Sequence, residues 1–185
     1  MIIGLSGTFG AGKDSVARYL VSRGFEHCST SDSLREFTTE RGRKLERENY
    51  RLTANELEEE FGGSILAKKC LDKRTGEDIT LSGIRRMGEI KFLRNQKDQF
   101  TLLFIDAPIE LRYQRMVDRS REGEEHISLE EMKRREGLET SGQSSQRLDV
   151  CQKEADEIVV NDDSEKALFT KIDKILEKIG WKAHK

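Results

Sequence analysis

The chain has 185 residues, of which 35% are hydrophobic and 37% are charged, with a formal net charge of −2. This length suits one domain with a substantial core, and the near-neutral charge favours neither nucleic acid nor an acidic membrane as partner. The opening apolar run is too short for a signal peptide or a membrane span. Cys28, Cys70 and Cys151 are odd in number and widely spaced. We therefore expect a cytoplasmic monomer or homodimer without a disulfide framework.

The most informative stretch of the sequence runs from residue 7 to residue 15. It follows the apolar run 1–5 and precedes a segment with helical spacing, so it joins a predicted strand to a predicted helix. In the pattern G-x-x-x-x-G-K, backbone N–H groups surround phosphate oxygens and the lysine reaches the outer phosphates. We predict that nucleotide phosphates bind to Gly7, Thr8, Phe9, Gly10, Ala11, Gly12, Lys13, Asp14 and Ser15.

One position departs from this pattern. Asp14 occupies the place where a Ser or Thr hydroxyl usually meets Mg²⁺, and Ser15 follows it. A carboxylate is a hard oxygen ligand that can bind Mg²⁺ directly or through water, so Asp14 and Ser15 are both candidate metal ligands. The added negative charge should weaken nucleotide binding when metal is absent.

The remaining elements alternate between strands and helices. Further strands are expected at 25–28, 78–82, 100–105 and 155–160, and the third of these is continuously apolar. Ser31 or Asp32 is expected to cap a helix, and the charged residues 40–52 to form a loop or an exposed helix end. Other helices are expected over 53–70 with a bend at Gly62-Gly63, and at 90–93, 108–120, 128–138 and 168–179.

This alternation predicts an α/β fold with a five-stranded parallel sheet and helices on both faces, the three-layer sandwich of P-loop nucleotide-binding proteins. In such a sheet, ligands bind over the carboxyl ends of the strands. Asp32, Arg85 and Asp106 follow predicted strands and should lie at that edge. For Asp106, which precedes Pro108, helix capping is the favoured role.

Several segments resemble the P-loop nucleoside monophosphate kinases, which include adenylate kinase, deoxynucleotide monophosphate kinases and dephospho-coenzyme A kinase. The segment S-T-S-D-S-L-R at 29–35 is similar to S-T-G-D-x-L-R of adenylate kinase. The resemblance implies that Thr30 and Arg35 hold the acceptor nucleotide. Asp32 matches the aspartate that is taken as the base in dephospho-coenzyme A kinases. The plainer alternatives are a loop residue for Thr30 and a helix cap for Asp32.

A second resemblance concerns the arginines. The segment G-I-R-R at 83–86 is similar to the D-G-x-x-R or D-G-x-R step whose arginine grips the acceptor phosphate, which implicates Arg85 and Arg86. Ser82 stands where that step usually has Asp. The segment R-M-V-D-R at 115–119 resembles R-I-V-G-R of adenylate kinase, so Arg115 and Arg119 are implied to border the donor nucleotide.

The last resemblances concern the second half of the chain. Residues 121–147 occupy the place of a closing lid and carry Lys133, Arg134 and Arg135, although a solvated helix face is the alternative. The segment A-D-E-I-V-V-N-D at 155–162 is similar to the close of dephospho-coenzyme A kinases, whose turn borders the donor adenine. We expect a single P-loop kinase domain over 1–185, with an acceptor-binding insertion at about 32–75 and a lid at about 121–147.

These observations together indicate an ATP- and Mg²⁺-dependent kinase acting on a small nucleotide. A nucleoside or deoxynucleoside monophosphate is favoured as acceptor over dephospho-coenzyme A, because residues 36–78 lack the segment L-E-x-I-x-H-P. The alternative from another class is a P-loop protein that binds nucleotide to regulate a partner. The candidate catalytic residues are Lys13, Asp32, Arg85, Arg119 and Arg134.

Overall fold

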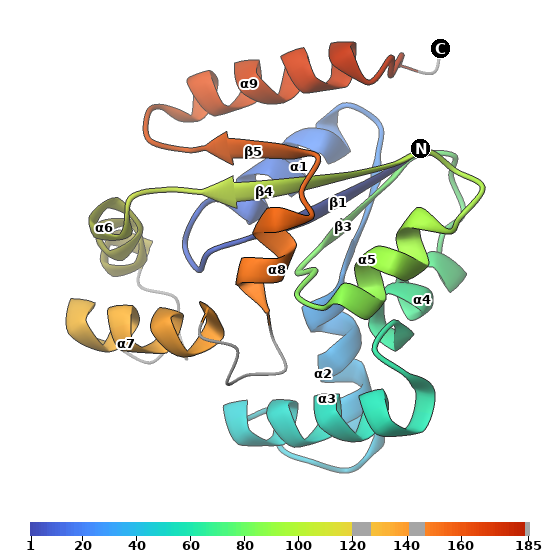
Figure 1. Cartoon of the computed structure of the whole chain (residues 1–185), viewed down its shortest axis with the longest axis vertical. Coiled ribbons are helices and arrows are strands. Elements are labelled where there is room, and N and C mark those ends of the chain that lie inside the picture. The colour runs from blue at the N-terminus through green and yellow to red at the C-terminus, as the bar shows by residue number, and fades with distance from the viewer. Residues whose placement is uncertain (120–126, 141–146, 184–185) are drawn as a thin grey trace.

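The computed structural model describes residues 1–119, 127–140 and 147–183. Five parallel strands form one sheet in the order β2-β3-β1-β4-β5, which confirms the predicted fold class (Figure 1). The strands are β1 (Ile2–Gly7), β2 (Glu26–Ser29), β3 (Ile79–Ser82), β4 (Phe100–Asp106) and β5 (Glu157–Val160). The helices of the described ranges are α1 (Lys13–Ser22), α2 (Thr30–Glu40), α3 (Arg47–Phe61), α4 (Ile65–Asp72), α5 (Met87–Arg94), α6 (Ile109–Arg119), α7 (Leu129–Thr140), α8 (Leu148–Lys153) and α9 (Glu165–Lys178).

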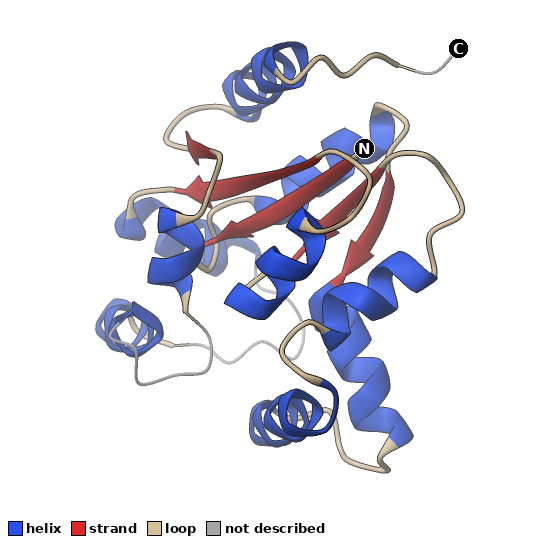
Figure 2. Ribbon diagram, turned by 45° about the vertical axis from the view of Figure 1, so that its right-hand side comes forward, coloured by secondary structure: helices blue, strands red, loops and turns tan. Residues whose placement is uncertain are grey.

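Helices cover both faces of the sheet (Figure 2). On one face, Ile3 and Leu5 of β1 pack in a buried cluster with residues of α1 and α9. On the other face, Ile2 belongs to a second cluster that contains Ile90 of α5 and Cys151 of α8. The central strand alternates between these two cores, which is why all of its residues are buried.

Helices α2, α3 and α4 lie between β2 and β3 in the chain and occupy the range predicted as the acceptor insertion. The predicted bend is present, because α3 ends at Phe61 and Gly62 adopts a φ of 85°. The adjacent Gly63 lies against Gly88 at the start of α5. A Cβ added to Gly88 would lie 2.8 Å from the backbone of Gly63. Part of the charged range 40–52 is helical, since α3 begins at Arg47.

The expectation that the cysteines form no disulfide was wrong. Cys28 of β2 and Cys70 of α4 form a disulfide whose Cα atoms lie 5.6 Å apart. Spacing alone could not reveal this pair, because 42 residues separate the two cysteines and only the packing of α4 beside β2 brings them together. Cys151 is free and buried, and burial raises the pKa of its thiol to about 11.

Helix α8 was not expected from the sequence. It has six residues, too few for a periodic signal, and its apolar side chains Leu148 and Cys151 are buried. The residue before it, Arg147, donates its backbone N–H to the Arg85 carbonyl at 3.0 Å, so α8 begins beside the loop after β3. No described helix is long and apolar enough to cross a membrane.

Candidate active site

The predicted phosphate loop connects β1 to α1 and has the backbone that the glycines were expected to allow. Gly7, Gly10 and Gly12 have φ values of 137°, 77° and 102°, which L-residues with side chains rarely adopt. An added Cβ at Gly7 would collide with the Ile105 carbonyl, and one at Gly12 with the Asn161 amide. These positions therefore require glycine for both conformation and space.

Lys13 lies at the first turn of α1 with its ammonium group inside the loop. Its Nζ donates to the carbonyl oxygens of Gly7 at 2.9 Å and Thr8 at 2.7 Å. The N-terminus of α1 contributes the positive end of its helix dipole at the same place. A cradle of glycines, a lysine and a helix N-terminus fits a phosphate group.

Three side chains hold the outside of the loop. Thr8 donates its hydroxyl to Asp106 at the end of β4 at 2.9 Å, and Asn161 donates its amide to the Ala11 carbonyl at 2.8 Å. The Phe9 carbonyl accepts a hydrogen bond of 3.0 Å from Nη1 of Arg112 in α6. Asp106 also accepts from the N–H of Ala107, so it fixes the loop as well as the turn before α6.

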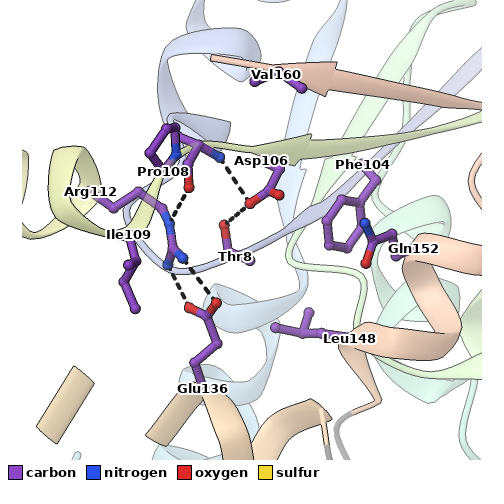
Figure 3. A pocket seen from close by; sticks show the side chains of 11 residues that line it. Thr8, Phe104, Asp106, Pro108, Ile109, Arg112, Glu136, Leu148, Gln152 and Val160 are labelled. Atoms are coloured by element: carbon purple, nitrogen blue, oxygen red, sulfur yellow. Dashed lines mark hydrogen bonds and ion pairs between the residues drawn. The ribbon is translucent and has the colours of Figure 1, made fainter. Parts of the chain in front are cut away.

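A pocket of about 490 Å³ lies beside the loop, between β4, α6, α7 and α8 (Figure 3). At its wall, Arg112 donates to Glu136 of α7 through two hydrogen bonds of 2.6 and 2.9 Å. The pocket is lined by Thr8, Phe104, Asp106, Ala107, Pro108, Ile109, Arg112, Glu136, Leu148, Gln152 and Val160. Sequence reasoning missed Arg112 and Glu136. Arg112 lies three residues before Arg115 on the same helix, and that spacing could have indicated a shared orientation.

Two segments predicted on the donor side meet behind the loop. Arg115 donates to the Asn161 carbonyl at 3.1 Å and to its side-chain oxygen at 3.4 Å. Asn161 follows β5 and itself bonds the loop at Ala11. The structure therefore brings Arg115 and the turn after β5 to the phosphate loop. Arg119 ends α6, but its side chain lies outside the described part of the structure, so its role stays a prediction.

The candidate metal ligands lie at the start of α1. Asp14 is exposed, and the Ser15 hydroxyl accepts from Arg18 at 3.0 Å. Nearby, His27 of β2 shares a hydrogen bond of 2.9 Å with Ser82 at the end of β3. Partial burial lowers the pKa of His27, while the charges of Asp32 and Asp14 oppose this shift.

Asp14 and Ser15 suit an Mg²⁺ ion that is held mainly by the phosphates of a bound nucleotide. Among the described residues, no group of three or more His, Cys, Asp and Glu side chains is arranged to bind a metal ion. Mg²⁺ is commonly held by one or two protein oxygens together with substrate phosphates and waters. The exposed Asp14 carboxylate beside the phosphate loop fits such a site, in which the nucleotide supplies most of the ligands.

The residues predicted to hold an acceptor begin at the carboxyl end of β2. Ser29 caps α2 by accepting the Asp32 N–H at 3.3 Å, so neither Ser31 nor Asp32 is the cap that the sequence indicated. Thr30 is buried, and its hydroxyl donates to the Gly83 carbonyl at 2.8 Å. The Asp32 carboxylate forms an exposed ion pair with Arg35. Thr30 thus joins α2 to the loop after β3, whereas Asp32 and Arg35 face solvent.

The two arginines after β3 have different surroundings. Arg86 is buried, donates to the Ala54 carbonyl at 3.3 Å and lies 3.5 Å from the Glu58 carboxylate, so it holds α3. The Arg85 and Arg86 N–H groups both donate to the buried Glu89 carboxylate, at 2.9 and 3.1 Å. Burial raises the pKa of Glu89 to about 7, although these hydrogen bonds and both arginines act in the opposite direction.

The predicted lid arginines pair within their own helix. Arg134 and Arg135 of α7 both donate to Glu131, at 2.7 and 2.6 Å, and these bonds lower the pKa of Glu131 to about 2. The parts of the predicted lid at 120–126 and 141–146 lie outside the described residues.

The arrangement of strands, loop and helices defines a P-loop kinase-like fold, and comparison with solved structures agrees. The Thermus thermophilus protein TT1252 superposes with a TM-score of 0.67 at 20% identity, covering 97% of each chain. Shikimate kinase from Acinetobacter baumannii superposes with a TM-score of 0.60 at 18% identity, covering 98% of this chain and 95% of that one. Dephospho-CoA kinase from Campylobacter jejuni superposes with a TM-score of 0.51 at 16% identity, covering 96% of each chain. At these identities the likeness concerns the fold.

The family follows from sequence comparison. The family model described as an AAA domain matches residues 3–139, so the chain belongs to that family. The UPF0200 protein of Methanothermobacter thermautotrophicus is 30% identical over 139 residues, covering 74% of this chain and 70% of the relative. The UPF0200/UPF0201 protein of Archaeoglobus fulgidus is 30% identical over 176 residues, covering 92% of this chain. The chain spans 53% of the length of that second relative.

Proposed function

We propose that the protein is an ATP- and Mg²⁺-dependent phosphotransferase whose acceptor is a small nucleotide, with a nucleoside or deoxynucleoside monophosphate as the leading candidate. The observation that carries this proposal is the position of the phosphate loop between two sets of groups. We assign the donor nucleotide to the side of Arg115 and Asn161 and the acceptor to the side of the loop after β3 with α2 to α4, because β1 lies between β3 and β4 in the sheet. A protein that only hydrolyses nucleotide needs no second substrate site.

The residues support transfer between two anions. An oxygen of the acceptor phosphate attacks the γ-phosphorus of ATP, the bond from that phosphorus to the β,γ-bridging oxygen breaks, and ADP leaves. Lys13 would place its charge on the transferring group, and Arg85 would hold the acceptor phosphate. Asp14 and Ser15 would hold Mg²⁺, which neutralises developing charge on the phosphates when bound. Arg134, after leaving Glu131, and Arg119 would close over the reaction.

Dephospho-coenzyme A is the second candidate acceptor. The exposed Asp32 carboxylate at the end of β2 favours it, because a ribose hydroxyl is a weak acid and needs a base. A regulatory nucleotide-binding protein is the candidate from another class. Ser82 favours this candidate. It occupies the position of the Asp that usually orients waters on Mg²⁺, and it shares a hydrogen bond with His27 instead.

A coupled ADP-release assay over a panel of acceptors tests these alternatives. The panel contains the ribonucleoside and deoxyribonucleoside monophosphates and dephospho-coenzyme A, with ATP and Mg²⁺ present throughout. We expect ADP release that depends on one group of monophosphates. Release with dephospho-coenzyme A alone would move the assignment to that acceptor. ATP binding without acceptor-dependent release would favour the regulatory protein and contradict the proposal.

A further inference from the structure

Arg112 of α6 has a buried guanidinium group whose donors serve three separate parts of the structure, and Figure 3 shows its two bonds to Glu136. The residue is 2% exposed. Its Nε donates to the Ala107 carbonyl in the turn before α6 at 2.7 Å, and its Nη1 donates to the Phe9 carbonyl of the phosphate loop at 3.0 Å. Its two terminal nitrogens also bind Glu136 of α7. The Arg112 side chain thus joins the phosphate loop to α7.

The hydrogen bond to Phe9 sets the direction of an N–H group in the loop. In a planar trans peptide, the carbonyl and the following N–H point in opposite directions. Because the Phe9 carbonyl points to Arg112, the Gly10 N–H points away from the Arg112 guanidinium. Gly10 also packs directly on this residue, since an added Cβ would lie 3.2 Å from the Arg112 carbonyl. Arg112 therefore fixes the direction of a loop N–H, the kind of group that binds phosphate oxygens in such loops.

Glu136 supplies the opposite charge for this buried cation. The pair is bidentate, and the Glu136 side chain is 26% exposed, whereas that of Arg112 is 3% exposed. If α7 moved away, the buried guanidinium would keep only neutral carbonyl partners among the bonds described, which is costly for a desolvated charge. The docking of α7 and the bonding of the loop therefore depend on the same group.

The chain contains a matched ion pair between the same two helices. Lys133 of α7 lies 3.4 Å from Glu110 of α6, and these side chains are 50% and 66% exposed. Exposed pairs contribute little to stability, because water and salt screen them. The Lys133–Glu110 pair also joins one positive and one negative side chain of the same helices, but in the described ranges no bond links it to the phosphate loop. It provides the control for the buried pair.

We propose that Arg112 is a positioning residue that couples nucleotide binding in the loop to the docking of α7 through Glu136. The inference rests on the proposed function in one respect, namely that the loop binds a nucleotide. When phosphate occupies the loop, the Gly10 N–H gains a partner, the Phe9 peptide is fixed, and Arg112 holds Glu136 more firmly. By linkage, a docked α7 strengthens nucleotide binding by the same factor.

Hydrogen exchange of the α7 amides, measured with a non-hydrolysable ATP analogue and Mg²⁺, tests the coupling in the full chain. In the wild type we expect the analogue to slow exchange in α7 by at least about fivefold. In Glu136→Gln we expect α7 to exchange faster without analogue, the analogue to cause no further slowing in α7, and its Kd to rise by a similar factor. Glu110→Gln should behave as the wild type does.

Arg112→Lys is the second variant, because it keeps the charge but cannot span three elements. We expect it to lose the analogue-dependent slowing in α7, and to lower kcat more than it raises the KM for the acceptor. Retained slowing in both Glu136→Gln and Arg112→Lys would overturn the coupling, even if both variants were less stable. A wild type that does not bind the analogue would refute the proposed function and the coupling together. A wild type that binds it without slowing in α7 would refute the coupling alone.

Discussion

Glu89 gives the sharpest prediction about stability, because its carboxylate is buried beside the candidate acceptor loop. The residue is 2% exposed and accepts hydrogen bonds from the Arg85 and Arg86 N–H groups. Burial dominates over these bonds and raises the pKa of Glu89 from 4.5 to about 7. The folded protein therefore holds a proton that the unfolded chain has already released.

The sign and size of the effect follow from proton linkage. Between about pH 4.5 and pH 7 the folded state binds more protons at Glu89 than the unfolded state, so this residue lowers the free energy of unfolding as pH rises. A shift of about 2.5 units at 1.36 kcal/mol per unit corresponds to about 3 kcal/mol, fully expressed above pH 7. Glu89→Gln keeps an oxygen that can accept from the two N–H groups but does not titrate.

Urea unfolding of both proteins at a series of pH values between 4 and 8 measures this difference. We expect the free energy of unfolding of the wild type to fall relative to that of Glu89→Gln by about 3 kcal/mol across the range. Glu59→Gln, a change at an exposed position of α3, is the control and should follow the wild type. If the wild-type and Glu89→Gln profiles run parallel, Glu89 is ionised in the folded protein and our account of its burial is wrong.

The remaining predictions concern the metal, α7 and the acceptor. Asp14→Ala should raise the Mg²⁺ concentration needed for half-maximal activity, with unchanged or tighter metal-free ATP binding; an unchanged Mg²⁺ titration would place the residue away from the metal. Arg134→Ala and Arg135→Ala should lower turnover with little change in the Kd of either substrate, as expected for contacts made in the transition state, and wild-type turnover in both would leave α7 without a direct catalytic part. Asp32→Asn should lower turnover by roughly tens-fold for a monophosphate acceptor and by several orders of magnitude for a hydroxyl acceptor. Arg85→Ala should raise the acceptor KM without changing ATP affinity, and equal damage to ATP binding would move Arg85 to the donor side.

The parts of the fold that the sequence predicted are those set by local chemistry. The apolar run of β4, the glycines of the phosphate loop and the break at Gly62-Gly63 each depend on neighbouring residues, and each is present in the structure. Helix α8 was missed because its six residues form less than two turns, too few to show a helical period.

The parts that the sequence could not show depend on tertiary packing. The Cys28–Cys70 disulfide and the Arg112–Glu136 pair each join residues that no local pattern connects. Tertiary packing also determines which polar side chains form hydrogen bonds within the protein. The Thr30 hydroxyl, for example, donates to the Gly83 carbonyl, and its assignment to the acceptor stays a prediction. A motif predicts which residue types gather at a site, but the packing around them decides which side chains stay available.

Acceptor-dependent formation of ADP by the wild type and by Lys13→Ala is the most direct test of the central claim. The Lys13 ammonium lies inside the loop, bonded to the Gly7 and Thr8 carbonyls, where it would meet the outer phosphates. We expect the wild type to form ADP in proportion to phosphorylated acceptor, and Lys13→Ala to lose at least about a hundredfold in rate while circular dichroism shows an intact fold. Near-normal turnover in Lys13→Ala would contradict the assignment of this loop as the site of phosphoryl transfer.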